Sequence, residues 1–83
     1  MYYVYLIRSK EHDWKYVGYT TDLEKRVKEH QKGLSKATGP YRPFDIIFYE
    51  AYKSKVDAKR REEYFKTNQG KRALRLMLKD SLK

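Results

Sequence analysis

The chain has 83 residues, which is enough for one small domain with a modest hydrophobic core. Hydrophobic residues make up 40% of it, which argues against a disordered chain, and the lack of cysteine excludes disulfides and thiolate metal sites. Its 20 Lys and Arg exceed its 11 Asp and Glu, so the net charge is +9 and the expected partner is a polyanion such as nucleic acid.

The basic excess lies mainly in the second part of the chain. Residues 1–52 carry nine basic and seven acidic side chains, whereas residues 53–83 carry eleven and four. No segment pairs a basic face with bulky aromatic anchors, so attachment to a membrane surface is less favoured than nucleic-acid binding. The first residues lack the features of a secretory signal, and the apolar runs are too short to cross a bilayer. We therefore expect a cytoplasmic protein.

The first twenty residues predict a β-hairpin. Residues 2–8 (YYVYLIR) and 14–20 (WKYVGYT) are rich in β-branched and aromatic side chains, and the polar segment SKEHD between them is typical of a turn. Side chains alternate between the two faces of a strand, so Tyr2, Val4 and Leu6 share one face, which we expect in the core.

The segment TDLEKRVKEHQKG at residues 21–33 predicts the first helix. Thr21 is the expected N-cap because Glu24 follows it at the spacing of a capping box, and Gly33 is the expected stop.

Two stripes run along this helix. Leu23 and Val27 are four residues apart and are expected to face the core. Arg26 and His30 are also four apart and form an adjacent polar stripe.

Glycine and proline predict a loop at residues 33–43, and a third strand is expected at residues 44–52 (FDIIFYEAY). The apolar residues of this strand do not alternate with polar ones, so both of its faces are expected to be covered.

A second helix is predicted to start after Ser54, which has Asp57 three residues later in the same capping pattern. The segment NQG at residues 68–70 is expected to end it. A third helix is then expected over residues 71–83, with a buried apolar side formed by Leu74, Met77 and Leu78.

The predicted order of elements is therefore β-β-α-β-α-α. It corresponds to a mixed α/β (α+β) fold in which a small three-stranded antiparallel sheet is flanked by helices. The chain shows no internal repeat, linker or low-complexity segment, so residues 1–83 are expected to form a single domain.

Short motifs in the hairpin resemble those of the GIY-YIG nuclease family. "YVY" at residues 3–5 and "YVG" at residues 16–18 are similar to the two motifs from which the family takes its name. Tyr5 ends the first motif and Tyr16 begins the second. The two tyrosines are eleven residues apart, a spacing that a hairpin can bring together. Tyr3 stands where the family name has glycine.

Helix positions extend the resemblance along nearly the whole chain. Arg26 and His30 match family positions on the first helix, and the pattern AKRREEYFK on the second points to Glu62. The chain is most similar to small stand-alone members of the family, which resemble the N-terminal nuclease module of a bacterial excinuclease.

This resemblance implies a metal-dependent endonuclease that hydrolyses phosphodiester bonds, with DNA as the expected substrate and repair or recombination as the expected setting. Glu62 would hold one divalent ion, with Mg²⁺ expected and Mn²⁺ as the alternative. Arg26 would bind the scissile phosphate and offset developing charge. The neighbouring Glu63, which points about 100° away around the helix, is the alternative metal ligand.

The resemblance leaves the identity of the general base open. Tyr5 would take a proton from the attacking water or position it, with Tyr16 assisting, although the reference pKa of tyrosine is about 10. His30, with a reference pKa of about 6.5, is the rival base, and it could instead bind a tyrosine or a phosphate by a hydrogen bond.

Further cations are candidates for contacts to the nucleic-acid backbone, which hold a strand without reading its sequence. These are Lys15, Lys25, Lys36, Arg42 and Lys66. Two alternatives to a self-sufficient enzyme remain: a nucleic-acid-binding module without turnover, and a nuclease subunit that needs a protein partner.

Overall fold

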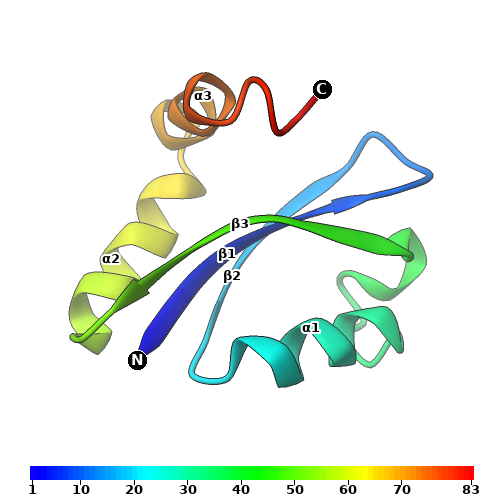
Figure 1. Cartoon of the computed structure of the whole chain (residues 1–83), viewed down its shortest axis with the longest axis horizontal. Coiled ribbons are helices and arrows are strands. Elements are labelled where there is room, and N and C mark those ends of the chain that lie inside the picture. The colour runs from blue at the N-terminus through cyan, green and yellow to red at the C-terminus, as the bar shows by residue number, and fades with distance from the viewer.

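The computed structural model describes all residues from 1 to 83 and contains a three-stranded antiparallel sheet with helices on both sides (Figure 1). The elements in chain order are β1 (Tyr2–Ser9), β2 (Lys15–Thr20), α1 (Leu23–Gln31), the short 3-10 helix η1 (Gly39–Tyr41), β3 (Phe44–Tyr52), α2 (Lys55–Phe65) and α3 (Asn68–Met77). The predicted fold class and element order are confirmed. None of the helices is both long and apolar enough to span a lipid bilayer.

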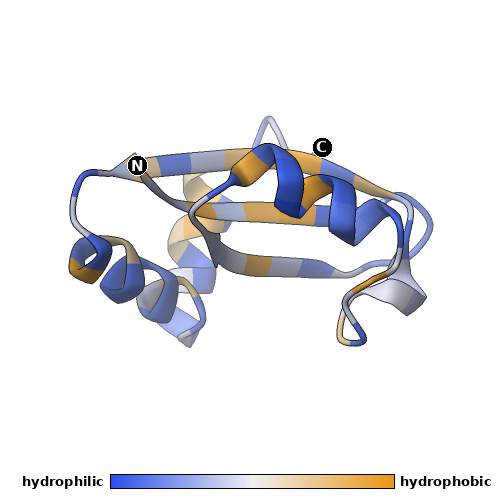
Figure 2. Cartoon of the chain, turned by 90° about the horizontal axis from the view of Figure 1, so that it is seen from below, coloured by the Kyte–Doolittle hydropathy of each residue, from blue (hydrophilic) through white to orange (hydrophobic).

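Strand β1 is the centre of the fold, because the strand order in the sheet is β2-β1-β3. Val4 and Leu6 are buried on the face that packs against α2 and α3, as expected, whereas Tyr2 is only half-buried. Tyr5 and Ile7 are buried on the opposite face, in a second core beside α1. Figure 2 shows that hydrophobic residues concentrate in the strands, while long stretches of the helices are hydrophilic.

The expectation that both faces of β3 are covered is wrong. The side chains of Ile46 and Tyr49 are 42% and 56% exposed. Strand β3 lies at the edge of the sheet, and its pairing with β1 is irregular between Leu6 and Ile7, where the register skips a residue of β3. Such a bulge disrupts the alternation of the strand, which accounts for the unbroken apolar run in the sequence.

Helix α1 begins one residue later than predicted. Asp22, not Thr21, is the N-cap, and its carboxylate accepts a hydrogen bond of 3.1 Å from the backbone N–H of Lys25. Both residue types cap well, so the sequence alone does not separate them. The predicted stop is confirmed, since Gly33 has a φ of 75°, a left-handed conformation that favours glycine.

The start of α2 at Ser54 is confirmed, but the junction with α3 differs from the prediction. Residues 68–70 form the first turn of α3 rather than a break, because the Thr67 hydroxyl caps this helix by accepting a hydrogen bond of 3.1 Å from the N–H of Gly70. A Cβ at Gly70 would overlap the backbone carbonyl of Tyr64. The glycine therefore allows a close approach between helices.

The buried side of α3 is narrower than predicted. Leu74 and Leu78 are 5% and 9% exposed and belong to the core on the α2 side of the sheet. Met77 is 49% exposed, so its assignment to the core is wrong. The helix also ends at Met77 instead of continuing to the end of the chain.

Candidate active site

A buried hydrogen-bond chain connects β1, α1 and the loop after α1. The Tyr5 hydroxyl lies 2.7 Å from His30 Nε2, and His30 Nδ1 lies 2.8 Å from the Thr38 hydroxyl. All three side chains are buried, with at most 1% exposed. The guanidinium of Arg26 beside Tyr5 can only donate. We therefore assign the Tyr5 O–H as the donor to Nε2 and the Nδ1–H as the donor to Thr38.

Burial keeps both members of the Tyr5–His30 pair uncharged at neutral pH. It raises the pKa of Tyr5 to about 12, although the neighbouring Arg26 opposes this shift. It lowers the pKa of His30 to about 4, and the positive charge of Arg26 acts in the same direction. The phenol is thus protonated and the imidazole neutral.

Gly18 of the "YVG" motif makes room for the Tyr5 ring. The two residues are direct neighbours in the register of β1 and β2. A Cβ at Gly18 would overlap both the ring carbon Cζ and the hydroxyl of Tyr5. The glycine is therefore required by the close approach of the phenol, and the same approach lets the hydroxyl reach His30.

Arg26 and Tyr16 lie at the partly open side of this buried pair. The Arg26 side chain is 31% exposed and lies 3.7 Å from the carboxylate of Glu29. Burial disfavours its charged form, but contact with the Tyr5 hydroxyl and the charge of Glu29 raise its pKa overall, so the guanidinium stays protonated. The half-buried Tyr16 ring lies 5.6 Å from the His30 ring between centroids, in an edge-on orientation.

Glu62 approaches the site from α2, on the opposite side of the sheet. It is 8% exposed, and its two carboxylate oxygens lie 2.9 Å from Lys59 Nζ and 3.1 Å from Lys66 Nζ. Burial alone would raise its pKa, but hydrogen bonds from the two ammonium groups lower it, so the carboxylate is ionised at neutral pH. Its charge is close enough to contribute to the raised pKa of Tyr5.

Lys66 links the two halves of the site, because its Nζ also lies 5.8 Å from the centroid of the Tyr16 ring. The structure thus brings Tyr5, Tyr16, Arg26 and His30 together and sets Glu62 beside them. The alternative carboxylate, Glu63, is exposed.

The donor set fits a hard divalent cation that keeps most of its water. Glu62 supplies an ionised carboxylate, and there is no cluster of three acidic or histidine side chains that would form a complete cage. Mg²⁺ is commonly held by one or two carboxylates together with water and phosphate oxygens. A metal at Glu62 would compete with Lys59 and Lys66 for the carboxylate oxygens.

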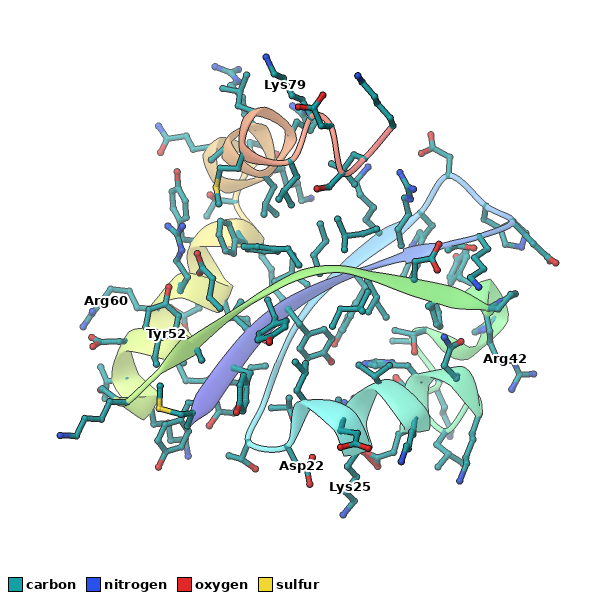
Figure 3. The ribbon with its side chains drawn as sticks, viewed as in Figure 1. Asp22, Lys25, Arg42, Tyr52, Arg60 and Lys79 are labelled. Carbon is teal, nitrogen blue, oxygen red and sulfur yellow. The ribbon has the colours of Figure 1, made fainter.

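The predicted backbone-binding cations do not form one patch. Lys25 and Arg42 point outward at separate places on the rim of the molecule (Figure 3). Arg42 also has a structural contact, because its guanidinium donates a hydrogen bond of 2.9 Å to the carbonyl of Lys32. Lys36 is exposed in the loop after α1, whereas Lys15 and Lys66 line a common cavity.

Sequence reasoning missed two residues that shape the site. Thr38 is the hydrogen-bond partner that orients His30, and no spacing signal connects a loop threonine to a histidine eight residues earlier. Lys59 pairs with Glu62 at a helical spacing of three residues, a pattern that the sequence does contain.

Comparison with known proteins agrees with this arrangement. A family model described as the GIY-YIG catalytic domain matches residues 1–75. The UPF0213 protein YazA of Bacillus subtilis is 42% identical over 66 residues, which cover 78% of this chain and 66% of that protein. A UPF0213 protein of Staphylococcus haemolyticus is 35% identical over 92% of this chain and 93% of its own length, and one of Clostridium perfringens is 34% identical over 100% and 89%. No solved structure matches the chain. The chain belongs to the GIY-YIG family, whose catalytic domains are nucleases.

Proposed function

We propose that this chain is a metal-dependent endonuclease that hydrolyses phosphodiester bonds in DNA. The observation that carries this proposal is the position of two opposite charges, one on each side of a pair of tyrosines. A permanently protonated Arg26 lies on one side of Tyr5 and Tyr16, and an ionised Glu62 lies on the other. Phosphodiester hydrolysis needs a cation for the phosphate and an anion that can hold a metal.

Arg26 is the group that would bind the scissile phosphate. Its planar guanidinium offers donors in a fork that matches phosphate oxygens, and its side chain is partly exposed. The contact with Tyr5 and the ion pair with Glu29 hold the guanidinium in place before substrate binds. A preorganised cation of this kind stabilises the charge that develops in the transition state.

The two tyrosines differ in access to solvent, and we assign them different roles. Tyr5 is 1% exposed, so it acts through its hydrogen bond with His30 and its contact with Arg26. Tyr16 is only half-buried, so its hydroxyl can contact the attacking water. In this proposal Tyr5 is a positioning residue, in place of the direct general base that the family resemblance implied.

His30 would accept a proton only when substrate is bound. In the free protein, burial and the charge of Arg26 keep the pKa of His30 at about 4. A phosphate bound to Arg26 offsets part of that charge and so raises the His30 pKa. The proton of the Tyr5 hydroxyl could then pass to His30 Nε2 over 2.7 Å. The Tyr5 oxygen would take the proton of the Tyr16 hydroxyl and Tyr16 that of the attacking water, which would leave the water as hydroxide and His30 as the imidazolium.

Glu62 would hold the divalent ion, with Mg²⁺ expected and Mn²⁺ as the alternative. The bound ion would lower the pKa of its water and neutralise charge on the phosphate. Both oxygens of Glu62 pair with lysines in the free protein. That observation also supports a second candidate function, a nucleic-acid-binding module in which the lysines exclude the metal and no turnover occurs.

The test uses labelled branched, nicked and single-stranded DNA, with Mg²⁺, Mn²⁺ or chelator. We expect metal-dependent cleavage of at least one substrate by the wild type, and a loss of about 100-fold or more in Arg26→Ala because a transition-state contact is removed. Lys28→Ala, which removes an exposed charge from the same helix, is the matched control and should retain activity. Salt-dependent binding without cleavage under any condition would favour the second candidate.

The resemblance to an excinuclease module suggests a setting in DNA repair or recombination. If the purified chain cleaves only after addition of a cell extract, a protein partner is required. Robust cleavage by the purified chain would show that no partner is needed for catalysis.

A further inference from the structure

A cavity of about 440 Å³ lies between β2 and the helices α2 and α3. Its floor consists of apolar side chains from the core on that side of the sheet, namely Leu6, Val17, Phe65 and Leu74. Its volume falls within the range of about 300–1,000 Å³ that is typical of small-ligand sites.

Four cations line this cavity: Lys15, Lys66, Lys71 and Arg75, with Asp13 as the single acidic residue. Lys66 pairs with Glu62, but Lys15, Lys71 and Arg75 are exposed and have no ion-pair partner in the structure. An apolar floor bordered by unpaired cations is complementary to a ligand that has an apolar body and a negative charge.

The cavity is continuous with the candidate active site. Tyr16 and Lys66 belong to both, and Lys66 Nζ lies 3.1 Å from the Glu62 carboxylate. Trp14 also borders the cavity. Its ring, however, packs with the core on the α1 side of the sheet, where it stacks on Tyr41 with centroids 4.1 Å apart and planes 9° apart. The Trp14 ring is also nearly parallel to Tyr16, at 6.0 Å between centroids and 14° between planes.

We propose that this cavity binds an unpaired nucleotide that flanks the scissile phosphate. The base would occupy the apolar space over Val17 and Leu74, and the flanking phosphate would lie against Lys71 and Arg75. Bases in a duplex are stacked and paired, so only an unpaired nucleotide can enter. This inference rests on the proposed function, which identifies the bound strand as DNA. It adds a substrate class, namely DNA with an unpaired base next to the cleavage position.

The single tryptophan of the chain provides a direct measurement, because Trp14 lines the cavity. The probe is a five-nucleotide thymidine strand, titrated in chelator so that no cleavage occurs. We expect it to quench Trp14 fluorescence. A strand of the same length with an abasic central unit, and a blunt duplex, should bind about tenfold more weakly or leave the fluorescence unchanged, since neither buries an apolar base surface against the floor of the cavity. Free thymidine monophosphate tests whether the strand is needed.

The double variant Lys71→Ala/Arg75→Ala should weaken binding of the thymidine strand by about tenfold. Lys53→Ala/Lys55→Ala is the matched control, because it removes two exposed, unpaired charges near the other end of α2. We expect less than a twofold change from it at the same salt concentration. Circular dichroism would verify that both variants fold.

Three outcomes would overturn the inference: equal affinity for the intact and abasic strands, equal losses in the two double variants, or an uncharged apolar dye that quenches Trp14 and is not displaced by the strand.

The failure of each proposal can be recognised separately. Cleavage that does not depend on an unpaired base removes this inference and leaves the nuclease proposal standing. Base-dependent quenching by a protein that never cleaves removes the nuclease proposal and leaves the nucleotide site standing.

Discussion

Tyr5 on the central strand and His30 in the last turn of α1 share a buried hydrogen bond of 2.7 Å. This contact connects the sheet to the helix that carries Arg26. Burial keeps the Tyr5 phenol protonated and the His30 imidazole neutral, so the hydrogen bond joins two uncharged groups. The bond therefore has both a structural and a chemical consequence, and the two can be measured separately.

Removing the Tyr5 hydroxyl should destabilise the fold. In Tyr5→Phe, the buried Nε2 of His30 loses its partner, so we expect the free energy of unfolding to fall by about 1–3 kcal/mol. Urea unfolding followed by circular dichroism measures this change. Tyr49→Phe, at an exposed tyrosine of β3, is the control and should change stability by less than about 0.5 kcal/mol. Equal effects from the two variants would contradict the structural role of the bond.

His30 should make the protein less stable in acid. Its folded pKa is lowered from 6.5 to about 4, so the unfolded chain binds the proton more readily below pH 6.5. Stability from this group is present above pH 6.5 and is lost as the pH falls towards 4, by up to about 3 kcal/mol.

The measurement for this effect is the unfolding free energy as a function of pH in wild type and two variants. The curve of His30→Gln should be flatter between pH 6.5 and 4 than that of the wild type. His12→Gln, at an exposed histidine, should keep the wild-type slope. If His30→Gln retains the full slope, other groups cause the pH dependence.

Gly18 should tolerate no side chain as long as Tyr5 is present. In Gly18→Ala the added Cβ overlaps the Tyr5 ring, so the phenol must move away from His30, and we expect a loss of about 1–3 kcal/mol in stability. A double-mutant cycle with Tyr5→Ala isolates the clash. The alanine at position 18 should cost much less in the Tyr5→Ala background, and additive effects would refute this explanation.

Lys59 should compete with a metal ion for Glu62. Lys59→Met removes an ammonium group that lies 2.9 Å from the carboxylate. The Mg²⁺ concentration that gives half-maximal cleavage should fall by about fivefold, since a unit charge at 4 Å in water is equivalent to about 1 kcal/mol. Lys55→Met, at the start of the same helix, should leave it unchanged. A higher Mg²⁺ requirement in Lys59→Met would mean that the lysine assists the site instead.

The three strands, two helix caps and the grouping of Tyr5, Tyr16, Arg26 and His30 could be predicted from the sequence. Local signals define the elements, and the family motifs define which of their residues meet. The N-cap of α1 was misplaced by one residue because Thr21 and Asp22 are both good caps.

Other features depend on tertiary contacts that no local pattern reports. The exposure of Ile46 follows from the edge position of β3 and from its bulge. The helical start at Asn68 follows from the Thr67 cap and from the close approach that Gly70 permits. The burial of Tyr5, which changes the role that we give it, follows from its contacts with α1 and with the glycine opposite.

The choice between Glu62 and Glu63 is the most direct test of the central claim. The two carboxylates are adjacent in α2, but Glu62 is 8% exposed and lies beside the tyrosine pair, whereas Glu63 is exposed to solvent. The measurement is single-turnover cleavage of the best DNA substrate in saturating Mg²⁺ by Glu62→Gln and Glu63→Gln. We predict a loss of about 100-fold or more in Glu62→Gln and wild-type cleavage in Glu63→Gln. Wild-type cleavage by Glu62→Gln, or equal losses in both variants, would contradict the account.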